Sequence, residues 1–140
     1  MLRKAEMAGC NTAVIELSSE AAKQYRHKFI YLDALVFTNL APEHIESHGS
    51  FEKYRTAKVS LVKNLKNKGV LVVNKDDENS IYFREATNKK VLEWSVNDHF
   101  DYKTKLIGDF NKKNILASVA LAKAFDIKEN AKEIESIYLK

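Results

Sequence analysis

The sequence predicts an α/β fold in which helices flank a parallel sheet and a small subsidiary antiparallel sheet lies beside it. Three apolar runs have the length of buried strands: residues 12–16, 34–38 and 70–73. The stretches between these runs are long enough for helical crossovers, which connect parallel strands. After residue 80 the apolar side chains alternate with polar ones, as in antiparallel strands. The expected antiparallel segments are residues 81–85, 91–94 and 101–107.

Composition is that of one soluble globular domain. The 140 residues are 45% hydrophobic and 30% charged, which is enough apolar sequence for a real core. No apolar run has the length of a membrane span, and the first residues show no signal-peptide pattern, so we expect a cytoplasmic protein without a membrane partner. The net charge of +4 comes from scattered lysines without interleaved aromatics, which does not indicate a nucleic-acid surface. A single cysteine, Cys10, excludes an internal disulfide.

The first strand is expected to present polar side chains at its carboxyl end. Residues 2–8 predict a helix that Gly9 ends, and the apolar run at 12–16 follows. Glu16, Ser18 and Ser19 come directly after that run. A carboxylate and two hydroxyls can bind a metal ion or polar substrate groups, or they can cap the next helix. The residues alone leave both interpretations open.

The second strand leads into a polar loop and a helix over residues 51–65. Ser50 is a good N-cap for that helix. Lys58 lies in the middle of its apolar face, so it either extends along the surface to water or is a modified lysine held in a site. The loop carries His44 and His48, four residues apart, but the zinc-protease pattern H-E-x-x-H is not met because the glutamate comes one place late, at Glu46.

The remaining segments are read from turns and periodicity. Residues 66–69 predict a turn before the strand at 70–73. After that strand, the Asn74-Lys75-Asp76-Asp77 segment predicts a solvated loop. It does not have the ligand spacing of a calcium-binding loop. The turn at 87–89 fits a hairpin. Asn111 predicts a helix cap before a long helix at 115–125. An amphipathic helix at about 129–139 closes the chain.

Three groups of residues, which follow one another along the chain in the family's order, resemble the central domain of the Mur ligases. One group resembles the pattern T-N-L-x-x-D-H-L-D-x-H-G, then Y-x-x-A-K, and is most similar to the UDP-N-acetylmuramyl-tripeptide synthetase branch. It consists of Thr38-Asn39-Leu40, Glu43-His44-Ile45-Glu46, His48-Gly49 and Tyr54-Arg55-Thr56-Ala57-Lys58. Glu16-Leu17-Ser18-Ser19, with Gln24 and Arg26, is similar to E-x-S-S-H-x-L, then Q-x-R. The segment from Gly108 resembles G-x-F-N-x-x-N-x-x-A. Glutamates replace the two aspartates, and Glu20 replaces the family histidine.

The resemblance implies an ATP-dependent carboxylate–amine ligase of peptidoglycan synthesis. Such an enzyme adds an amino acid to a UDP-N-acetylmuramyl-peptide through an acyl phosphate, with ATP and Mg²⁺ as cofactors. By carry-over, the metal site would contain Glu16, His44 and Lys58, with His44 and a carbamylated Lys58 taking part in catalysis. The residues that would bind ATP are Asn39, Asn111 and Asn114. The residues that would bind the nucleotide-sugar substrate are Ser18, Ser19, Gln24, Arg26 and His48.

The resemblance also implies that residues 1–140 are part of a central domain that begins after its phosphate loop. None of the four glycines opens a G-K-[ST] motif, so we expect the partners of this chain to include the N- and C-terminal domains of a longer protein. The alternatives are a non-catalytic binding or scaffold module of the same fold and a ligase similar to folylpolyglutamate synthetase. Which amino acid is added cannot be read from these residues.

Overall fold

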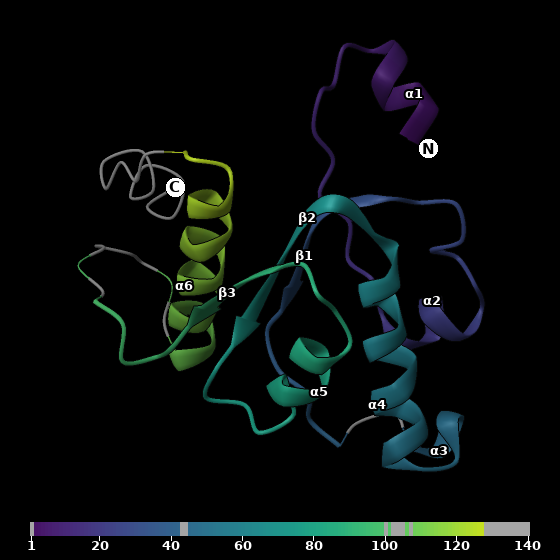
Figure 1. Cartoon of the computed structure of the whole chain (residues 1–140), viewed down its shortest axis with the longest axis vertical. Helices are drawn as coiled ribbons and strands as arrows, with labels where there is room; N and C mark the ends of the chain where they lie inside the picture. Colours follow the sequence, from purple (N-terminus) through teal and green to yellow (C-terminus); the bar gives the residue numbers. More distant parts are fainter. Residues whose placement is uncertain (1, 43–44, 100, 102–105, 107, 128–140) are drawn as a thin grey trace.

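A three-stranded parallel sheet forms the centre of the computed structural model, which describes residues 2–42, 45–99, 101, 106 and 108–127. The strand order is β1-β2-β3, with β1 at Leu32–Phe37, β2 at Leu65–Asn74 and β3 at Lys90–Trp94 (Figure 1). Leu71, Val72 and Val73 of β2 have no exposed surface. Burial on both faces is typical of the central strand of a parallel sheet, so the α/β prediction is confirmed.

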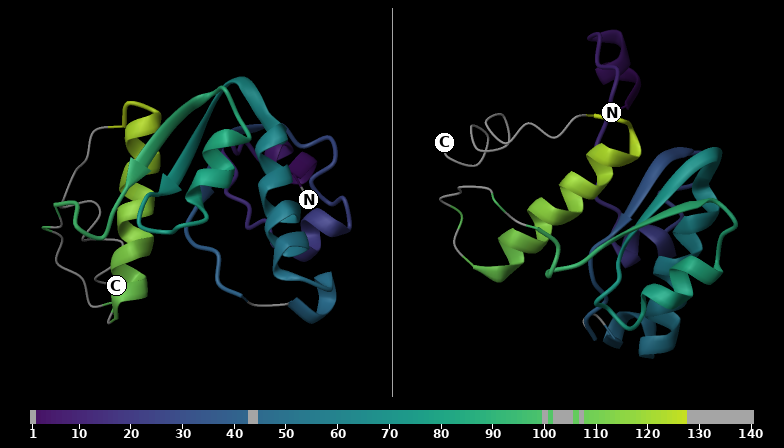
Figure 2. Two further views of the ribbon diagram at one scale, coloured as in Figure 1. Left: turned by 60° about the horizontal axis from the view of Figure 1, so that its bottom comes forward. Right: turned by 60° about the vertical axis from the view of Figure 1, so that its left-hand side comes forward.

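Helices cover both faces of the sheet. The crossover from β1 to β2 contains α3 (Ile45–His48), α4 (Phe51–Ser60) and the 3₁₀ helix η1 (Leu61–Asn64). The crossover from β2 to β3 contains α5 (Ser80–Glu85). Helix α6 (Asp109–Ala124) packs on the face opposite α4 and α5 (Figures 1 and 2). Two short helices, α1 (Leu2–Met7) and α2 (Ser19–Lys23), precede β1, and α2 packs against α4.

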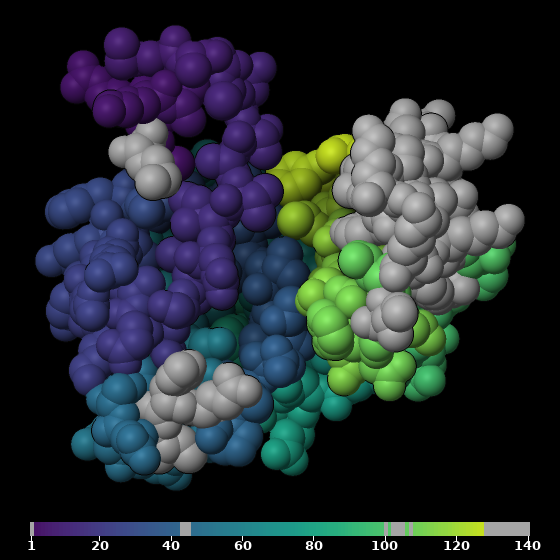
Figure 3. Space-filling model, turned by 180° about the vertical axis from the view of Figure 1, so that it is seen from behind, coloured from purple at the N-terminus to yellow at the C-terminus, as the bar shows by residue number. Residues whose placement is uncertain are grey.

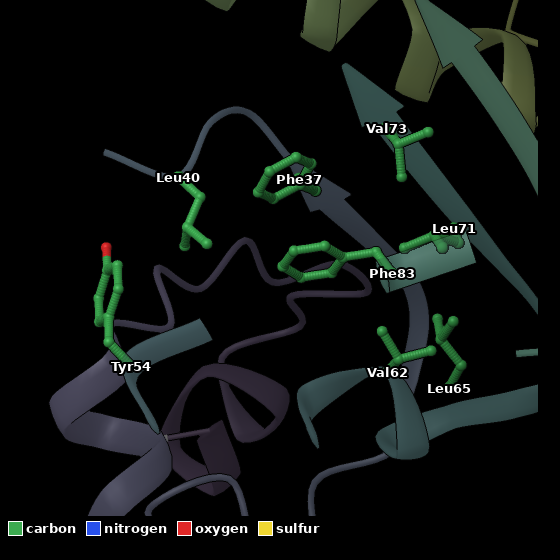
Figure 4. Close-up of a cluster of buried hydrophobic side chains, with 8 residues drawn as sticks. All are labelled: Phe37, Leu40, Tyr54, Val62, Leu65, Leu71, Val73 and Phe83. Carbon is green, nitrogen blue, oxygen red and sulfur yellow. The ribbon is translucent and has the colours of Figure 1, made fainter. Parts of the chain in front are cut away.

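Alternate side chains of β2 enter two separate cores. Leu71 and Val73 point toward α4 and α5, where the rings of Phe37 and Phe83 stack with centroids 4.1 Å apart (Figure 4). The other core lies under α6 and is centred on Val72. The residues that complete it are Val70, Trp94, Leu116, Ala117 and Ala120. This two-sided packing follows directly from the two-residue period of a strand. None of the helices in the described ranges has both the length and the apolar composition to span a bilayer.

The strand expected at residues 12–16 is wrong. The segment between α1 and α2 has no strand pairing and runs over the surface, where it is the purple stretch in Figure 3. Val14 is 91% exposed and Ile15 is 40% exposed. An apolar run becomes a strand only when a neighbouring strand takes its backbone hydrogen bonds, and the described sheet ends at β1 on this side.

The subsidiary antiparallel sheet is also wrong within the described residues. Residues 81–85 belong to helix α5, because Ser80 and Phe83, three residues apart, are buried while Ile81 and Tyr82 are exposed. Residues 91–94 belong to β3, which pairs with β2 in parallel. The turn at 87–89 therefore joins a helix to a strand. The segment expected at 101–107 lies mostly outside the described residues, as does the helix expected at 129–139.

The turn expected at residues 66–69 is an irregularity inside β2. Leu32 pairs with Leu65 and Ala34 with Val70, so β2 carries extra residues between the two pairs. At Gly69 a Cβ atom would lie 3.0 Å from the backbone oxygen of Lys66 and 3.1 Å from that of Leu32. A larger residue would force these backbone atoms to shift, so the close approach favours glycine. The helix expected to reach residue 65 changes to η1 after Ser60.

Three side chains that follow β2 tie the ends of all three strands together. Asn74, which is 4% exposed, donates from Nδ2 to the Thr38 carbonyl after β1 at 3.0 Å. Asp77 accepts the Leu40 amide at 2.8 Å through Oδ2. Asp76 accepts the Ser95 hydroxyl at 2.9 Å and the Val96 amide at 2.7 Å, both after β3. The segment read as a solvated loop is thus a hydrogen-bonded clamp.

We expect Asp77→Ala to destabilise the chain because it leaves the Leu40 amide, and the Asn79 amide at 2.8 Å, without their acceptor. The loss in the free energy of unfolding should be about 2–3 kcal/mol, the range for removing a charged acceptor from partly buried donors. Chemical denaturation followed by circular dichroism measures it. The exposed neighbour Glu78 gives a matched control, and Glu78→Ala should change stability by less than about 0.5 kcal/mol. Equal losses in the two variants would contradict the clamp.

Candidate functional site

The predicted site residues lie on elements that meet at the carboxyl ends of the strands. The loop after β1 carries Asn39, and helices α4 and α6 both begin at this end of the sheet (Figures 1 and 2). Asn39 is exposed, and its Oδ1 accepts the Thr38 hydroxyl at 3.3 Å. In parallel α/β sheets this edge is where ligands bind, because loops and helix N-termini converge there.

Helix α2 uses one of the two predicted serines as its cap. Ser18 is the N-cap, and its Oγ accepts the Ala21 amide at 3.1 Å. Ser19 is buried, with 2% of its surface exposed. Glu16, Gln24 and Arg26 are exposed. The capping interpretation is therefore confirmed for Ser18, and the assignment of these residues to substrate binding stays a prediction.

The turn around Arg26 has an unusual backbone. Tyr25 has a φ of 55° and Phe29 a φ of 67°, both in the left-handed region. Their side chains are 66% and 85% exposed. Aromatic residues rarely adopt this conformation, which costs roughly 1–2 kcal/mol per residue. These two strained positions could not be predicted from the sequence, because no glycine stands at either of them.

His48 and Lys58 share one aromatic neighbour on α4. The ring of His48 meets that of Tyr54 edge-on, with centroids 5.5 Å apart. The Nζ of Lys58 lies 5.3 Å from the same Tyr54 ring, and Lys58 is half-buried. Such a contact is favourable for a lysine ammonium, because the ring electrons attract a cation. The structure therefore brings together two of the predicted residues and places them against α2.

Glu20 is the residue that sequence reasoning passed over. It lies in the first turn of α2, and its Oε1 is 3.6 Å from Nε2 of His48. Lys23 of the same helix donates from Nζ to the Ser47 carbonyl. The signal in the sequence was the glutamate at a position where the resemblance leads one to expect histidine.

The described residues do not by themselves form a metal site. Among them, no three His, Cys, Asp or Glu side chains lie close enough to hold an ion. His44 lies outside the described residues, and Glu16 is exposed on the segment before α2. Lys58 contacts Tyr54. The zinc pair of His44 and His48 is likewise untested, because only His48 is described.

Asn111 and Asn114 lie in the first turns of α6. The N-cap is Gly108, with a φ of 104°, and no side chain caps this helix. Asn111 is therefore a residue of the helix itself, and its predicted capping role is wrong. Asn114 is exposed. Both lie in the part of α6 that begins at the carboxyl ends of the strands, where the N–H groups of a helix start favour negative charge.

A shallow hollow of about 550 Å³ lies away from these residues. It is lined by the beginning of β2 and the turn between α5 and β3, including Leu65, Thr87 and Lys89. These segments are at the amino ends of the strands, so the hollow is not part of the candidate site.

Comparison with known proteins identifies relatives along most of the chain. The family described as Mur ligase middle domain matches residues 1–101. The UDP-N-acetylmuramoyl-L-alanyl-D-glutamate–2,6-diaminopimelate ligase of Listeria monocytogenes is 30% identical over 164 residues, covering 94% of this chain and 33% of the relative. The UDP-N-acetylmuramyl-tripeptide synthetase of Treponema denticola is 34% identical over 163 residues, covering 84% and 31%.

A solved structure gives the same fold. A UDP-N-acetylmuramoyl-L-alanyl-D-glutamate–2,6-diaminopimelate ligase superposes on this chain with a TM-score of 0.77 at 24% identity, covering 98% of this chain and 34% of that one. The chain thus spans about a third of the length of the relatives it matches. The predicted resemblance is confirmed: this chain belongs to the Mur ligase family, whose middle domain it matches over residues 1–101.

Proposed function

We propose that this chain is the central part of an ATP-dependent ligase that joins an amino acid to a UDP-N-acetylmuramyl-peptide. The observation that carries the proposal is the match of residues 1–101 to the Mur ligase middle domain. The printed names of the relatives describe ligation to UDP-N-acetylmuramoyl-L-alanyl-D-glutamate and synthesis of a UDP-N-acetylmuramyl-tripeptide. A cytoplasmic location is a further prediction of this proposal.

The proposed chemistry joins two substrates in two steps. A carboxylate of the muramyl-peptide attacks the γ-phosphorus of ATP and releases ADP, which gives an acyl phosphate. The amine of the incoming amino acid then attacks the acyl carbon, and inorganic phosphate leaves as the amide bond forms. Such phosphoryl transfer depends mainly on holding the reactants in line and on stabilising the negative charge that develops.

The residues near the carboxyl ends of the strands would bind different parts of the substrates. We assign Asn39 to the phosphate side of ATP and Asn111 and Asn114 to its adenine side, because all three elements begin or end at this edge. Side-chain amides can both donate and accept hydrogen bonds, which suits a base or a phosphate. We assign the nucleotide-sugar substrate to the residues Ser18, Ser19, Gln24, Arg26 and His48. Exposure of Gln24 and Arg26 supports this assignment.

Mg²⁺ is a proposed cofactor of the complete protein, in which it would neutralise charge on the phosphates. Glu16, His44 and Lys58 are the proposed ligands. The described residues alone do not form that site. Glu16 is exposed and able to bind a ligand, whereas Lys58 would first have to become a carbamate, since an ammonium cannot coordinate a metal ion. We propose that this modification occurs only in the complete protein.

The ligase proposal has a direct test in the intact protein that carries these 140 residues. We expect ADP to form over many turnovers only when ATP, a UDP-N-acetylmuramyl-peptide and an amino acid are all present, because the first step alone releases one ADP per active site. Testing a set of amino acids identifies the one that is added. Chromatography of the muramyl-peptide product measures the reaction. No reaction with any amino acid would favour the non-catalytic module, and ADP release without any new amide product would contradict the ligase proposal.

The isolated 140-residue chain should bind ATP only weakly. A phosphate-binding loop supplies most contacts to the β- and γ-phosphates, and no G-K-[ST] motif occurs in this sequence. Isothermal titration calorimetry with Mg²⁺ and ATP gives the affinity. Submicromolar binding would show that these residues hold the nucleotide by other contacts.

Replacing Lys58 separates a modified site lysine from a surface lysine. In the intact protein, Lys58→Met should lower turnover by about a hundredfold or more, because a lost group that stabilises developing charge costs that much. In Lys58→Ala, which leaves space for an added ligand, short-chain carboxylates should restore part of the activity. Lys53, exposed on the same helix, provides the control, and Lys53→Met should keep its turnover. Normal turnover of Lys58→Met would mean that the contact with Tyr54 is the whole role of this lysine.

A further inference from the structure

A buried contact between helices α2 and α3 is not used by the proposed chemistry. Nε2 of His48 lies 3.6 Å from Oε1 of Glu20, and the two side chains are 3% and 41% exposed. The Nε2 atom is buried and has no hydrogen-bond partner among the described residues. At 3.6 Å the pair is just beyond hydrogen-bond distance and within the distance of an ion pair. A nitrogen buried in this way requires a partner.

The contact fixes where the proton of the imidazole lies. A carboxylate only accepts hydrogen bonds, and an imidazole nitrogen without a proton also only accepts them. Two acceptors facing each other inside the protein would repel, so Nε2 must carry a proton when Glu20 is ionised. The ring of Tyr54 also packs against the imidazole, with an interplanar angle of 63°. Glu20 therefore selects both the tautomer and the direction of the ring.

We propose that Glu20 is a positioning residue that holds His48 in its Nε2–H form and thereby locks α2 to α3. A second contact, from Lys23 Nζ to the Ser47 carbonyl, joins the same two helices. Helix α2 begins at Ser18, so the pair sets the position of the Ser18–Ser19 turn relative to the loop before α4. Its effect on substrate binding rests on the proposed function; the contact itself does not.

Nuclear magnetic resonance of the 140-residue chain tests the contact without any activity. We expect a resolved Nε2–H proton for His48 in the wild type, protected by burial and by its acceptor. Glu20→Ala should lose this signal to exchange with water. Glu20→Gln should keep it at a shifted position, because the amide oxygen of glutamine is still an acceptor beside Nε2. The matched control is Glu52→Ala, which removes an exposed glutamate in the first turn of α4 and should leave the signal unchanged.

A double-mutant cycle distinguishes direct coupling from a general loss of packing. Glu20→Ala and His48→Ala should each raise the unfolding equilibrium constant by some factor. In the double variant, the combined factor should be smaller than the product of the two single factors by at least about twofold. Independent effects, an unprotonated Nε2 in the wild type, or an unchanged Nε2–H signal in Glu20→Ala would overturn the proposal.

Kinetics of the intact protein then test the positioning role. Glu20→Ala should raise the KM for the UDP-N-acetylmuramyl-peptide several-fold while changing kcat less, since it misplaces a binding group and leaves the reacting groups in place. Glu20→Gln should restore most of that loss. An unchanged KM would overturn the positioning role. If the wild type makes no amide product, the ligase proposal fails while the resonance experiment still decides the Glu20–His48 contact.

Discussion

The clamp formed by Asn74, Asp76 and Asp77 is the constraint on which the rest of this structure depends. Parallel strands are not joined by tight turns, so their carboxyl ends have no covalent reason to stay together. Here side chains from the central strand's own loop take hydrogen bonds from the loops after β1 and β3. All three loops are thereby held at one edge, and one of them carries Asn39. The order of the candidate site therefore depends on the hydrogen bonds of this clamp.

Elements that depend on a local sequence pattern were predictable from the sequence. Elements that depend on which segments pack beside them were not. The apolar runs at 34–38 and 70–73 became β1 and β2, because a buried parallel strand is apolar throughout. The run at 12–16 has the same composition but no described strand beside it. Alternation at 81–85 was misleading because so short a window fits a helix as well as a strand, and the buried pair Ser80 and Phe83 shows the helical period.

The site shows the same division. The cap at Ser18 is a local arrangement and was predictable from the sequence. The remaining assignments came from resemblance to a known family. They say what each residue would do but not where its side chain lies. The contact of Glu20 with His48 joins helices that are separated by β1, so only the packing of α2 against α3 and α4 could reveal it. The clamp after β2 was missed for the same reason, since its partners lie in two other loops, after β1 and after β3.

The central place of β2 has a consequence for synthesis on the ribosome. Strand β1 emerges first, yet its only described partner is β2, which is made after the whole α3–α4 crossover. Until then the apolar side chains and backbone groups of β1 lack this described partner, and exposed groups of that kind make nascent chains prone to aggregate or to recruit chaperones. Strand β3 does not wait in this way, because β2 is already present when it appears. Of the three described strands, β1 therefore stays longest without its described partner.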